Sequence, residues 1–281
     1  MGKLMDKVGV WTESKHEILR KYCAAYTTIM NAQQRFHWWY IDAFAGCGEQ
    51  WSKEKDCKVP GSPLVALSIE PKFERYIFID LKHKKAEHLK QLVPDRDDVE
   101  VLEQDANSAL KTIIPRVDYS KYMRALCVLD PYGLHLDWSV VEQCGHAGSI
   151  ELFLNFPIHD INRNVHRQDT TRIRASDRGR LNAFWGDSSW QDVMYSSEEN
   201  LFGLQDSVGG NNEIVAAYKK RLETVAGFEH VPEPVAMYNK RNADLYYLFF
   251  ASHNRAAGKI VSDIFRTYTG LGVRYGSRIK H

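Results

Sequence analysis

The strongest constraint on this chain is a series of short apolar runs that alternate with helix-like segments. The runs cover residues 38–44, 76–79, 99–102, 125–129 and 150–154. Apolar runs of this length, bounded by polar or glycine-rich turns, are typical of buried parallel strands. Their alternation with helices predicts a βαβ sheet that is covered on both faces.

Helices are expected before and between these runs. The first is expected over residues 10–34, where Ser14 and Glu17 have the spacing of a capping box and apolar side chains recur on one helical face. Another is expected to begin at Ser62, because the proline that follows is tolerated in the first helical turn. The segment 81–92 predicts a third helix with solvent-facing lysines. Its expected inward contacts are Leu81, His88, Leu89 and Leu92.

The alternation stops in the second half of the chain. Residues 156–231 hold an arginine-rich segment followed by an amphipathic one, which we interpret as a mainly helical insertion. Two further apolar runs, 235–240 and 246–253, lie so close together that their strands must be antiparallel, since a parallel pair needs a long crossover. A mostly parallel sheet that ends in an antiparallel hairpin is the strand pattern of class I methyltransferases.

We therefore expect a single methyltransferase-like α/β domain over residues 1–281. Its Rossmann-like sheet has seven strands and is mostly parallel, with an antiparallel last strand. The helical insertion lies between strands 5 and 6.

A glycine turn follows the first apolar run, in the order Asp42, Ala, Phe44, Ala, Gly46, Cys, Gly48. Glycine lacks a Cβ and tolerates positive φ, so a ligand can approach the backbone at this edge of the sheet. The Asp42 carboxylate can position the loop or the ligand. A plain turn that closes a strand is the alternative. The dinucleotide fingerprint requires a third glycine where this chain has Trp51, which argues against NAD and FAD.

The second and third apolar runs are followed by acids. Asp80 can accept hydrogen bonds from two ribose hydroxyls, and Asp105 can accept one from an adenine amino group, with the Ala106 N–H near a ring nitrogen. Each acid could instead cap the next helix. The three strand ends together predict a site for S-adenosylmethionine (SAM), and the long loop Glu49–Gly61 could cover it. The candidate cofactor residues are Asp42, Phe44, Gly46, Gly48, Asp80, Asp105 and Ala106.

The fourth run is followed by Asp130, Pro131, Tyr132 and Gly133. An acid followed by proline and an aromatic residue suits an exocyclic amine, because the carboxylate and a carbonyl accept the amine hydrogens while the ring stacks on the base. Asp130, Pro131 and Tyr132 are therefore the candidate catalytic residues. The usual motif has one more proline, so a strand-ending turn remains the alternative. No cysteine follows a proline, which sets aside methylation at carbon 5 of cytosine.

Beyond the fifth run, Asn155 could border a substrate pocket, and arginines recur from Arg163 to Arg180. Arg163 and Arg167 are candidate phosphate contacts, and the neighbouring aromatics could stack on bases. A solvated helix face with internal ion pairs is the alternative. The aromatics in question are Phe184, Trp185 and Trp190.

Composition bears on the expected partners, metal sites and cellular location. The formal net charge is +1, so any contact with nucleic acid depends on a local patch. The five cysteines are scattered without metal-ligand spacing, which indicates reduced thiols and predicts no metal site. An apolar leader and an apolar stretch long enough to span a bilayer are both missing, so we expect a cytoplasmic protein without membrane contact.

Several stretches resemble the three-Cys-motif partner (TcmP) family. They are YIDAFAGCG, GSPLVAL, FIDLK, DPYG, LNFPIHDINR and LYYLFFASHNRAAGKIVSDI. The likeness runs from Trp11 to Phe265. It implies a class I methyltransferase-like fold with SAM positions at Asp42, Gly46, Gly48, Asp80 and Asp105. It also implies a bacterial or phage setting and a functional link to a separate protein that bears a three-cysteine motif.

The leading hypothesis is a SAM-dependent methyltransferase that acts on an exocyclic amine of a nucleic-acid base. One alternative is a SAM-binding or catalytically silent accessory protein that works with the three-cysteine-motif partner. A methyltransferase of protein or of a small molecule is a further alternative.

Overall fold

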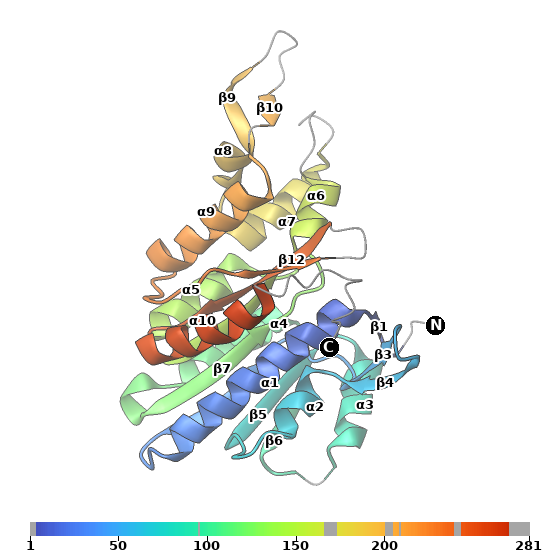
Figure 1. Ribbon diagram of the computed structural model, residues 1–281, viewed down its shortest axis with the longest axis vertical. Coiled ribbons are helices and arrows are strands. Elements are labelled where there is room, and N and C mark those ends of the chain that lie inside the picture. The colour runs from blue at the N-terminus through green and yellow to red at the C-terminus, as the bar shows by residue number, and fades with distance from the viewer. Residues whose placement is uncertain are drawn as a thin grey trace.

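A seven-stranded sheet forms the centre of the protein (Figure 1). The computed structural model describes residues 4–94, 96–165, 173–199, 205–207, 209–238 and 243–269, and every count here refers to that part. The strand order is β11-β12-β8-β7-β2-β5-β6, and β12 is antiparallel to both of its neighbours. This order confirms the predicted class I methyltransferase fold. The strands are β2 (His37–Asp42), β5 (Arg75–Asp80), β6 (Val99–Glu103), β7 (Met123–Leu129), β8 (Ile150–Phe156), β11 (Val235–Tyr238) and β12 (Asp244–Ala251).

Side chains alternate between two apolar cores, one on each face of the sheet. Tyr40 and Leu126 point into the core beneath α1 (Val10–Asn31), α2 (Ser62–Leu67), α3 (His83–Leu92) and α10 (Arg255–Thr269). Ile41 and Cys127, each one residue further along, point into the core beneath α4 (Ala106–Ile113), α5 (Trp138–Ala147) and the insertion. Because both faces are covered, the central strands β2, β5, β7 and β8 carry apolar side chains at consecutive positions.

The insertion follows β8 and is mainly helical, as predicted. It contains α6 (Ile158–Asn164), α7 (Ala175–Trp185), α8 (Trp190–Met194) and α9 (Asn211–Thr224). A hairpin of β9 (Tyr195–Glu199) and β10 (Gln205–Ser207) projects away from the sheet at the top of Figure 1.

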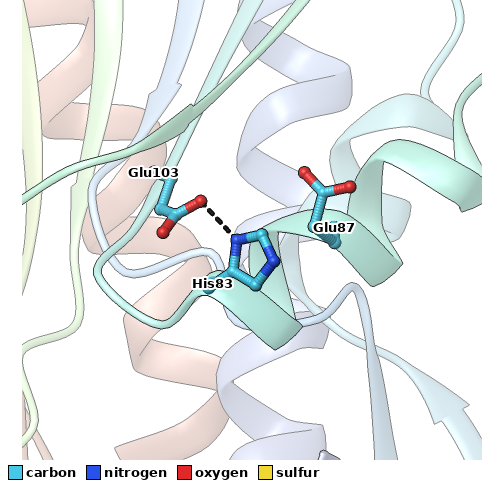
Figure 2. Close-up of side chains that lie close together, drawn as sticks. All are labelled: His83, Glu87 and Glu103. Atoms are coloured by element: carbon cyan, nitrogen blue, oxygen red, sulfur yellow. Dashed lines mark hydrogen bonds and ion pairs between the residues drawn. The ribbon is translucent and has the colours of Figure 1, made fainter.

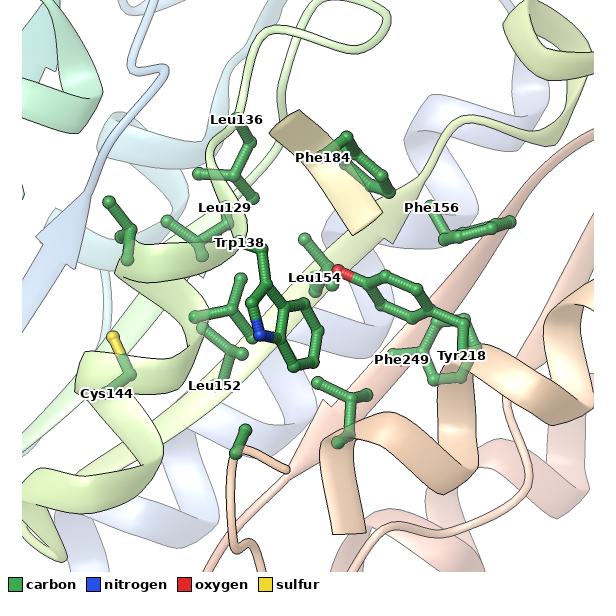
Figure 3. Close-up of a cluster of buried hydrophobic side chains, with 14 of the residues drawn as sticks. Leu129, Leu136, Trp138, Cys144, Leu152, Leu154, Phe156, Phe184, Tyr218 and Phe249 are labelled. Atoms are coloured by element: carbon green, nitrogen blue, oxygen red, sulfur yellow. The ribbon is translucent and has the colours of Figure 1, made fainter. Parts of the chain in front are cut away.

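Aromatic side chains join the insertion to the sheet (Figure 3). The Tyr218 ring of α9 lies 4.7 Å from the Phe156 ring and 5.5 Å from the rings of Trp138 and Phe184, measured between centroids. Such pairs add stability beyond the apolar area that they bury. Phe184, Trp185 and Trp190 are at most 1% exposed, so the expectation that they stack on bases is wrong.

Replacing Phe184 with Ala is expected to lower the free energy of unfolding by about 3–5 kcal/mol, because it empties a buried ring site. Tyr218→Phe is the matched control. Its buried hydroxyl has no hydrogen-bond partner among the described residues, so its loss should be neutral or stabilising. Urea denaturation measures both changes. A larger loss in Tyr218→Phe than in Phe184→Ala would contradict this account of the core.

The segment Glu49–Gly61 is not a structureless loop. It forms β3 (Glu49–Ser52) and β4 (Cys57–Pro60), which pair with each other, and β1 (Lys7–Val8) adds to β3 as a parallel strand. The Ser52 hydroxyl donates to Glu13 of α1 over 2.8 Å, which ties this small sheet to the first helix.

Two local predictions about helices are also corrected. Ser14 lies inside α1, whose N-cap is Gly9, so the capping box with Glu17 does not begin the helix. Of the expected inward contacts, Leu89 is buried, but Leu81, which lies before α3, is 69% exposed and Leu92 is 37% exposed. Lys85 is buried on α3 instead, and its ammonium donates to Asp6 over 2.5 Å. In the described part of the chain, no helix is long and apolar enough to cross a bilayer.

Candidate functional site

The carboxyl ends of β2 and β5 bring the glycine turn and Asp80 together. The Gly46 N–H donates to Asp80 Oδ2 over 3.0 Å, and the Lys82 N–H donates to Asp80 Oδ1 over 2.8 Å. Gly46 and Gly48 have φ of +66° and +82°, which L side chains rarely adopt. Apart from its two chain neighbours, no described residue lies within 4 Å of where a Cβ on Gly46 would stand, so this side of the turn faces open space that a ligand can fill.

Asp42 is fully buried beneath the turn. Its carboxylate accepts from the Phe44 N–H over 3.2 Å, so the side chain holds the turn in place. Burial raises the pKa of Asp42 to about 6, and the hydrogen bonds from Ser62 and Phe44 oppose that rise. Asp42 therefore acts on the loop, which is one of the two roles expected from the sequence.

The buried Asp42 predicts a pH-dependent effect on stability. In the unfolded chain the pKa of Asp42 is near 3.8, so between pH 8 and 5 the folded protein takes up a proton that the unfolded chain does not bind. The contribution of Asp42 to stability therefore rises as the pH falls, by about 1 kcal/mol over this range. Urea denaturation of the parent and of Asp42→Asn gives their free energies of unfolding at pH 8 and pH 5. The difference between the two proteins should change by this amount between the two pH values. Asp118→Asn is the control, because hydrogen bonds from Ser120 hold the pKa of Asp118 below its ordinary value and no change is expected there. A pH-independent difference for Asp42→Asn would contradict the prediction.

Asp105 follows β6 and caps α4. Its Oδ1 accepts from the Ser108 N–H over 2.9 Å, which is the helix-cap role. The side chain is exposed, Ala106 is buried behind it, and Phe44 is half-buried. The structure thus shows the helix-cap role of Asp105, and its contact with adenine stays a prediction.

Asp130 forms an ion pair that the sequence did not indicate. The Lys15 ammonium, from α1, donates to Asp130 Oδ2, and the two side chains are 11% and 29% exposed. The neighbouring His16 is buried, and burial together with the Lys15 charge lowers its pKa to about 3. His16 is therefore neutral near pH 7, so Lys15 and not His16 supplies the positive charge beside Asp130.

The two residues after Asp130 differ sharply in exposure. Pro131 is buried, whereas the Tyr132 ring is 84% exposed, with the Lys82 ammonium 5.8 Å from its centroid. Gly133 has φ of +66°, and a Cβ there would lie 2.9 Å from an Asp160 carboxylate oxygen. The turn thus presents an aromatic ring to solvent and is closely packed behind it.

A cleft of about 570 Å³ opens beside this turn. Its walls include Lys15, Asp130, Tyr132, Asn155 and Arg163. Asn155 is buried, and its side-chain oxygen has no hydrogen-bond partner in the described structure. The structure therefore brings the candidate catalytic and substrate residues to one cleft, apart from Arg167, which lies outside the described residues together with Arg172.

The cleft and the glycine turn share one edge of the sheet. Parallel strands all end on the same side, and β7, β2 and β5 are consecutive neighbours. Strands lie about 4.8 Å apart, so the residues after β7 and β5 are separated by roughly 10 Å. Asp130 also contributes to raising the pKa of Asp42 through its charge, which agrees with this closeness.

Two residues at this edge were not among the candidate site residues predicted from the sequence. Lys15 belongs to an ordinary amphipathic helix and carries no local signal. Leu81 is a large apolar side chain left 69% exposed directly after Asp80. The sequence places Leu81 directly after a candidate ligand-binding acid, and that position could have drawn attention to it.

Three side chains of the kinds that bind metal ions lie close together at the outer end of the same sheet edge: His83, Glu87 and Glu103 (Figure 2). His83 Nδ1 lies 2.7 Å from Glu103 Oε2, and Glu87 is on the next turn of α3. The hydrogen bond and charge of Glu103 raise the pKa of His83. We interpret this exposed group as an ion pair that joins α3 to β6.

The comparisons with solved structures concern the fold. Protein LPL1258 from Legionella pneumophila str. Philadelphia 1, of family model DUF519, has a TM-score of 0.54 at 12% identity, covering 93% of each chain. Two others superpose more loosely. The N-methyltransferase NodS from Bradyrhizobium japonicum WM9, in complex with S-adenosyl-l-homocysteine, has a TM-score of 0.39 at 10% identity, over 87% of this chain and 88% of that one. The 23S rRNA methyltransferase ErmE has a TM-score of 0.37 at 13% identity, over 91% and 78%.

No protein-family model matches the sequence, and no curated protein matches it. An identity of 12% shows the fold alone. The class I methyltransferase-like fold rests on the strand order of the sheet, and the chemistry has to come from the residues of the site.

Proposed function

We propose that this protein is a SAM-dependent methyltransferase that acts on an exocyclic amine of a nucleic-acid base. One observation carries the proposal: a single sheet edge holds the Gly46–Asp80 hydrogen bond and, roughly 10 Å away, Asp130 and the exposed Tyr132 in one cleft. That separation matches a site in which the cofactor lies along the edge with its methyl group toward the cleft.

The residues present fit the cofactor. Asp80 is placed to accept ribose hydroxyls, exposed Leu81 offers an apolar face to adenine, and the open side of Gly46 leaves room for the amino-acid part. In this proposal Asp105, the N-cap of α4, accepts a hydrogen bond from the adenine amino group. SAM, when bound, supplies the methyl group as an electrophile.

The chain's own residues orient the acceptor. Asp130 accepts an amine hydrogen and stabilises the positive charge that develops on the nitrogen, while Lys15 holds the other side of the carboxylate. The exposed Tyr132 ring stacks on the base, and Asn155 lies within the same cleft. Pro131, buried behind them, stiffens the turn.

The direct test is transfer of tritium from methyl-labelled SAM to DNA, RNA, peptide and small-molecule fractions. Calorimetric titration of SAM is run beside it. Label in a nucleic-acid fraction, on an exocyclic nitrogen after digestion, supports the proposal. Label confined to protein or small molecules would show that the acceptor belongs to that class instead. Failure to bind SAM would contradict the proposal that the protein is a SAM-dependent enzyme.

The Lys15–Asp130 ion pair favours a second candidate. A cation on Asp130 compensates the charge that would stabilise the acceptor, as expected in a catalytically silent SAM-binding accessory protein. Such a protein would work with the three-cysteine-motif partner that the family resemblance implies. It would bind SAM and transfer no methyl group in isolation.

Contact with nucleic acid predicts a salt dependence. Arg163 is exposed and lines the cleft, so if it contacts a phosphate, Arg163→Gln should flatten the plot of log affinity against log salt by up to about one unit of slope. Fluorescence anisotropy with a single-stranded RNA measures it. Arg266→Gln on α10, away from the cleft, is the control and should leave the slope unchanged. A flat salt response in the parent protein would favour the solvated-face interpretation.

A further inference from the structure

A second cavity, of about 330 Å³, lies at the opposite edge of the sheet. Its walls include Arg124 and Glu151, each the second residue of its strand, whereas the cleft lies beyond the carboxyl ends of the same strands. The length of β7 separates the two edges by roughly 20 Å. The volume falls in the range of roughly 300–1,000 Å³ that is usual for small-molecule sites.

One wall of this amino-edge cavity is cationic. The Arg124 guanidinium lies 4.0 Å from the Tyr119 ring centroid and 4.8 Å from that of Phe36, and it donates to the Met123 carbonyl over 2.7 Å. These contacts hold the planar donor fork in one orientation, as bidentate recognition of a phosphate requires. Arg255 is exposed at the rim and is the first residue of α10, so the positive end of that helix faces the same space.

The other wall is apolar. Tyr26 and Met30 of α1 are buried, and Ile29 is 39% exposed at the rim. Together with Phe36 they offer a surface suited to a planar ring. A ligand that satisfies both walls needs a compact anionic group and an apolar or aromatic face.

Glu151 is the acid in the cavity wall, and its charge offsets that of the two arginines only in part. Its carboxylate accepts from the Tyr22 hydroxyl and, over 3.3 Å, from the Ser252 hydroxyl. Burial raises the pKa of Glu151 to about 7, so a large fraction is protonated at neutral pH. His253, also in the wall, is engaged elsewhere, with Nε2 2.7 Å from the Gly145 carbonyl oxygen.

We propose that the amino-edge cavity binds a nucleoside monophosphate as a ligand separate from cofactor and acceptor. Arg124 and Arg255 hold the phosphate, and the base lies against the apolar wall at Ile29 and Phe36. The site does not depend on the proposed methyl transfer, because it shares no residue with the glycine turn or the cleft.

The test is calorimetric titration with AMP, with S-adenosylhomocysteine present in excess to occupy the carboxyl edge. Arg124→Gln should weaken AMP binding at least about tenfold and Arg255→Gln about threefold. Arg266→Gln, further along the same helix, is the matched control and should have no effect. Because Arg124 also stabilises its surroundings, a second pair of variants uses the exposed Ile29. Both variants lose the apolar side chain, but only glutamate repels the phosphate, so Ile29→Glu should bind AMP at least about threefold more weakly than Ile29→Lys.

Three further titrations define the ligand. AMP should bind more tightly than either inorganic phosphate or adenosine, and Glu151→Gln should bind AMP as tightly as the parent or more so. Equal binding of adenosine and AMP would overturn the phosphate site, and equal binding of phosphate and AMP would overturn the base site. Loss of binding in Glu151→Gln would show that the acid, not the arginines, recognises the ligand, and no binding of AMP at millimolar concentration would overturn the proposal.

Discussion

Replacement of Asp130 by Ala is expected to lower the rate of methyl transfer at least about hundredfold while SAM affinity stays within about threefold of the parent. The carboxylate lies in the cleft beside the exposed Tyr132, whereas among the described residues it is Asp80 that accepts from the Gly46 N–H of the glycine turn. An interaction that strengthens as charge develops on the acceptor nitrogen affects turnover and leaves ground-state binding of the cofactor nearly unchanged. Tritium transfer and calorimetric titration measure the two quantities separately.

Variants of the Lys15–Asp130 ion pair make this experiment more specific. Asp130→Asn should retain part of the activity, because the amide oxygen still accepts a hydrogen bond but supplies no charge. Lys15→Met removes the compensating ammonium and keeps the apolar stem of the side chain. In an enzyme whose Lys15 orients the carboxylate, transfer should fall. In a silent accessory protein, neither the parent nor any of these variants should transfer a methyl group. A parent rate in Asp130→Ala would remove Asp130 from the reaction.

Most of the fold could be predicted because its signals are local. The buried parallel strands are apolar at consecutive positions, since Tyr40 and Ile41 face opposite cores, and this produces short apolar runs that are easy to locate. The antiparallel pairing of β11 and β12 follows from the short connection between them, because a parallel pair needs a long crossover. The strand-end positions of Asp42, Asp80, Asp105 and Asp130 follow from the same runs.

What could not be predicted depends on contacts between distant segments. Lys15 and Asp130 lie 115 residues apart in sequence, and nothing near Lys15 distinguishes it from the other lysines of the chain. The segment Glu49–Gly61 folds as a hairpin, and residues 7–8 pair with it as a third strand. No local sequence pattern predicts this pairing. Trp185 and Trp190 follow an arginine-rich segment, so composition suggested base stacking, whereas packing against the sheet buries both.

The second large effect is expected at the cofactor. Asp80→Ala should weaken SAM binding at least about tenfold, because each hydrogen bond from a ribose hydroxyl to a carboxylate makes a net contribution of about 1.5–3 kcal/mol. The structure adds a further reason. Asp80 also accepts the Gly46 N–H over 3.0 Å, so its removal frees the turn that the amino-acid part of SAM would contact.

The same edge of the sheet offers a matched control for Asp80. Glu103 ends the neighbouring strand β6 and is an exposed acid that bonds to His83. If the effect of Asp80→Ala were only the loss of one negative charge at this edge, Glu103→Ala should weaken SAM binding equally. If Asp80 contacts the ribose, Glu103→Ala should change the affinity by less than about twofold, and thermal unfolding of both variants should remain cooperative. An unchanged SAM affinity in Asp80→Ala would place the cofactor elsewhere, because no other described carboxylate is hydrogen-bonded to the glycine turn's Gly46 N–H.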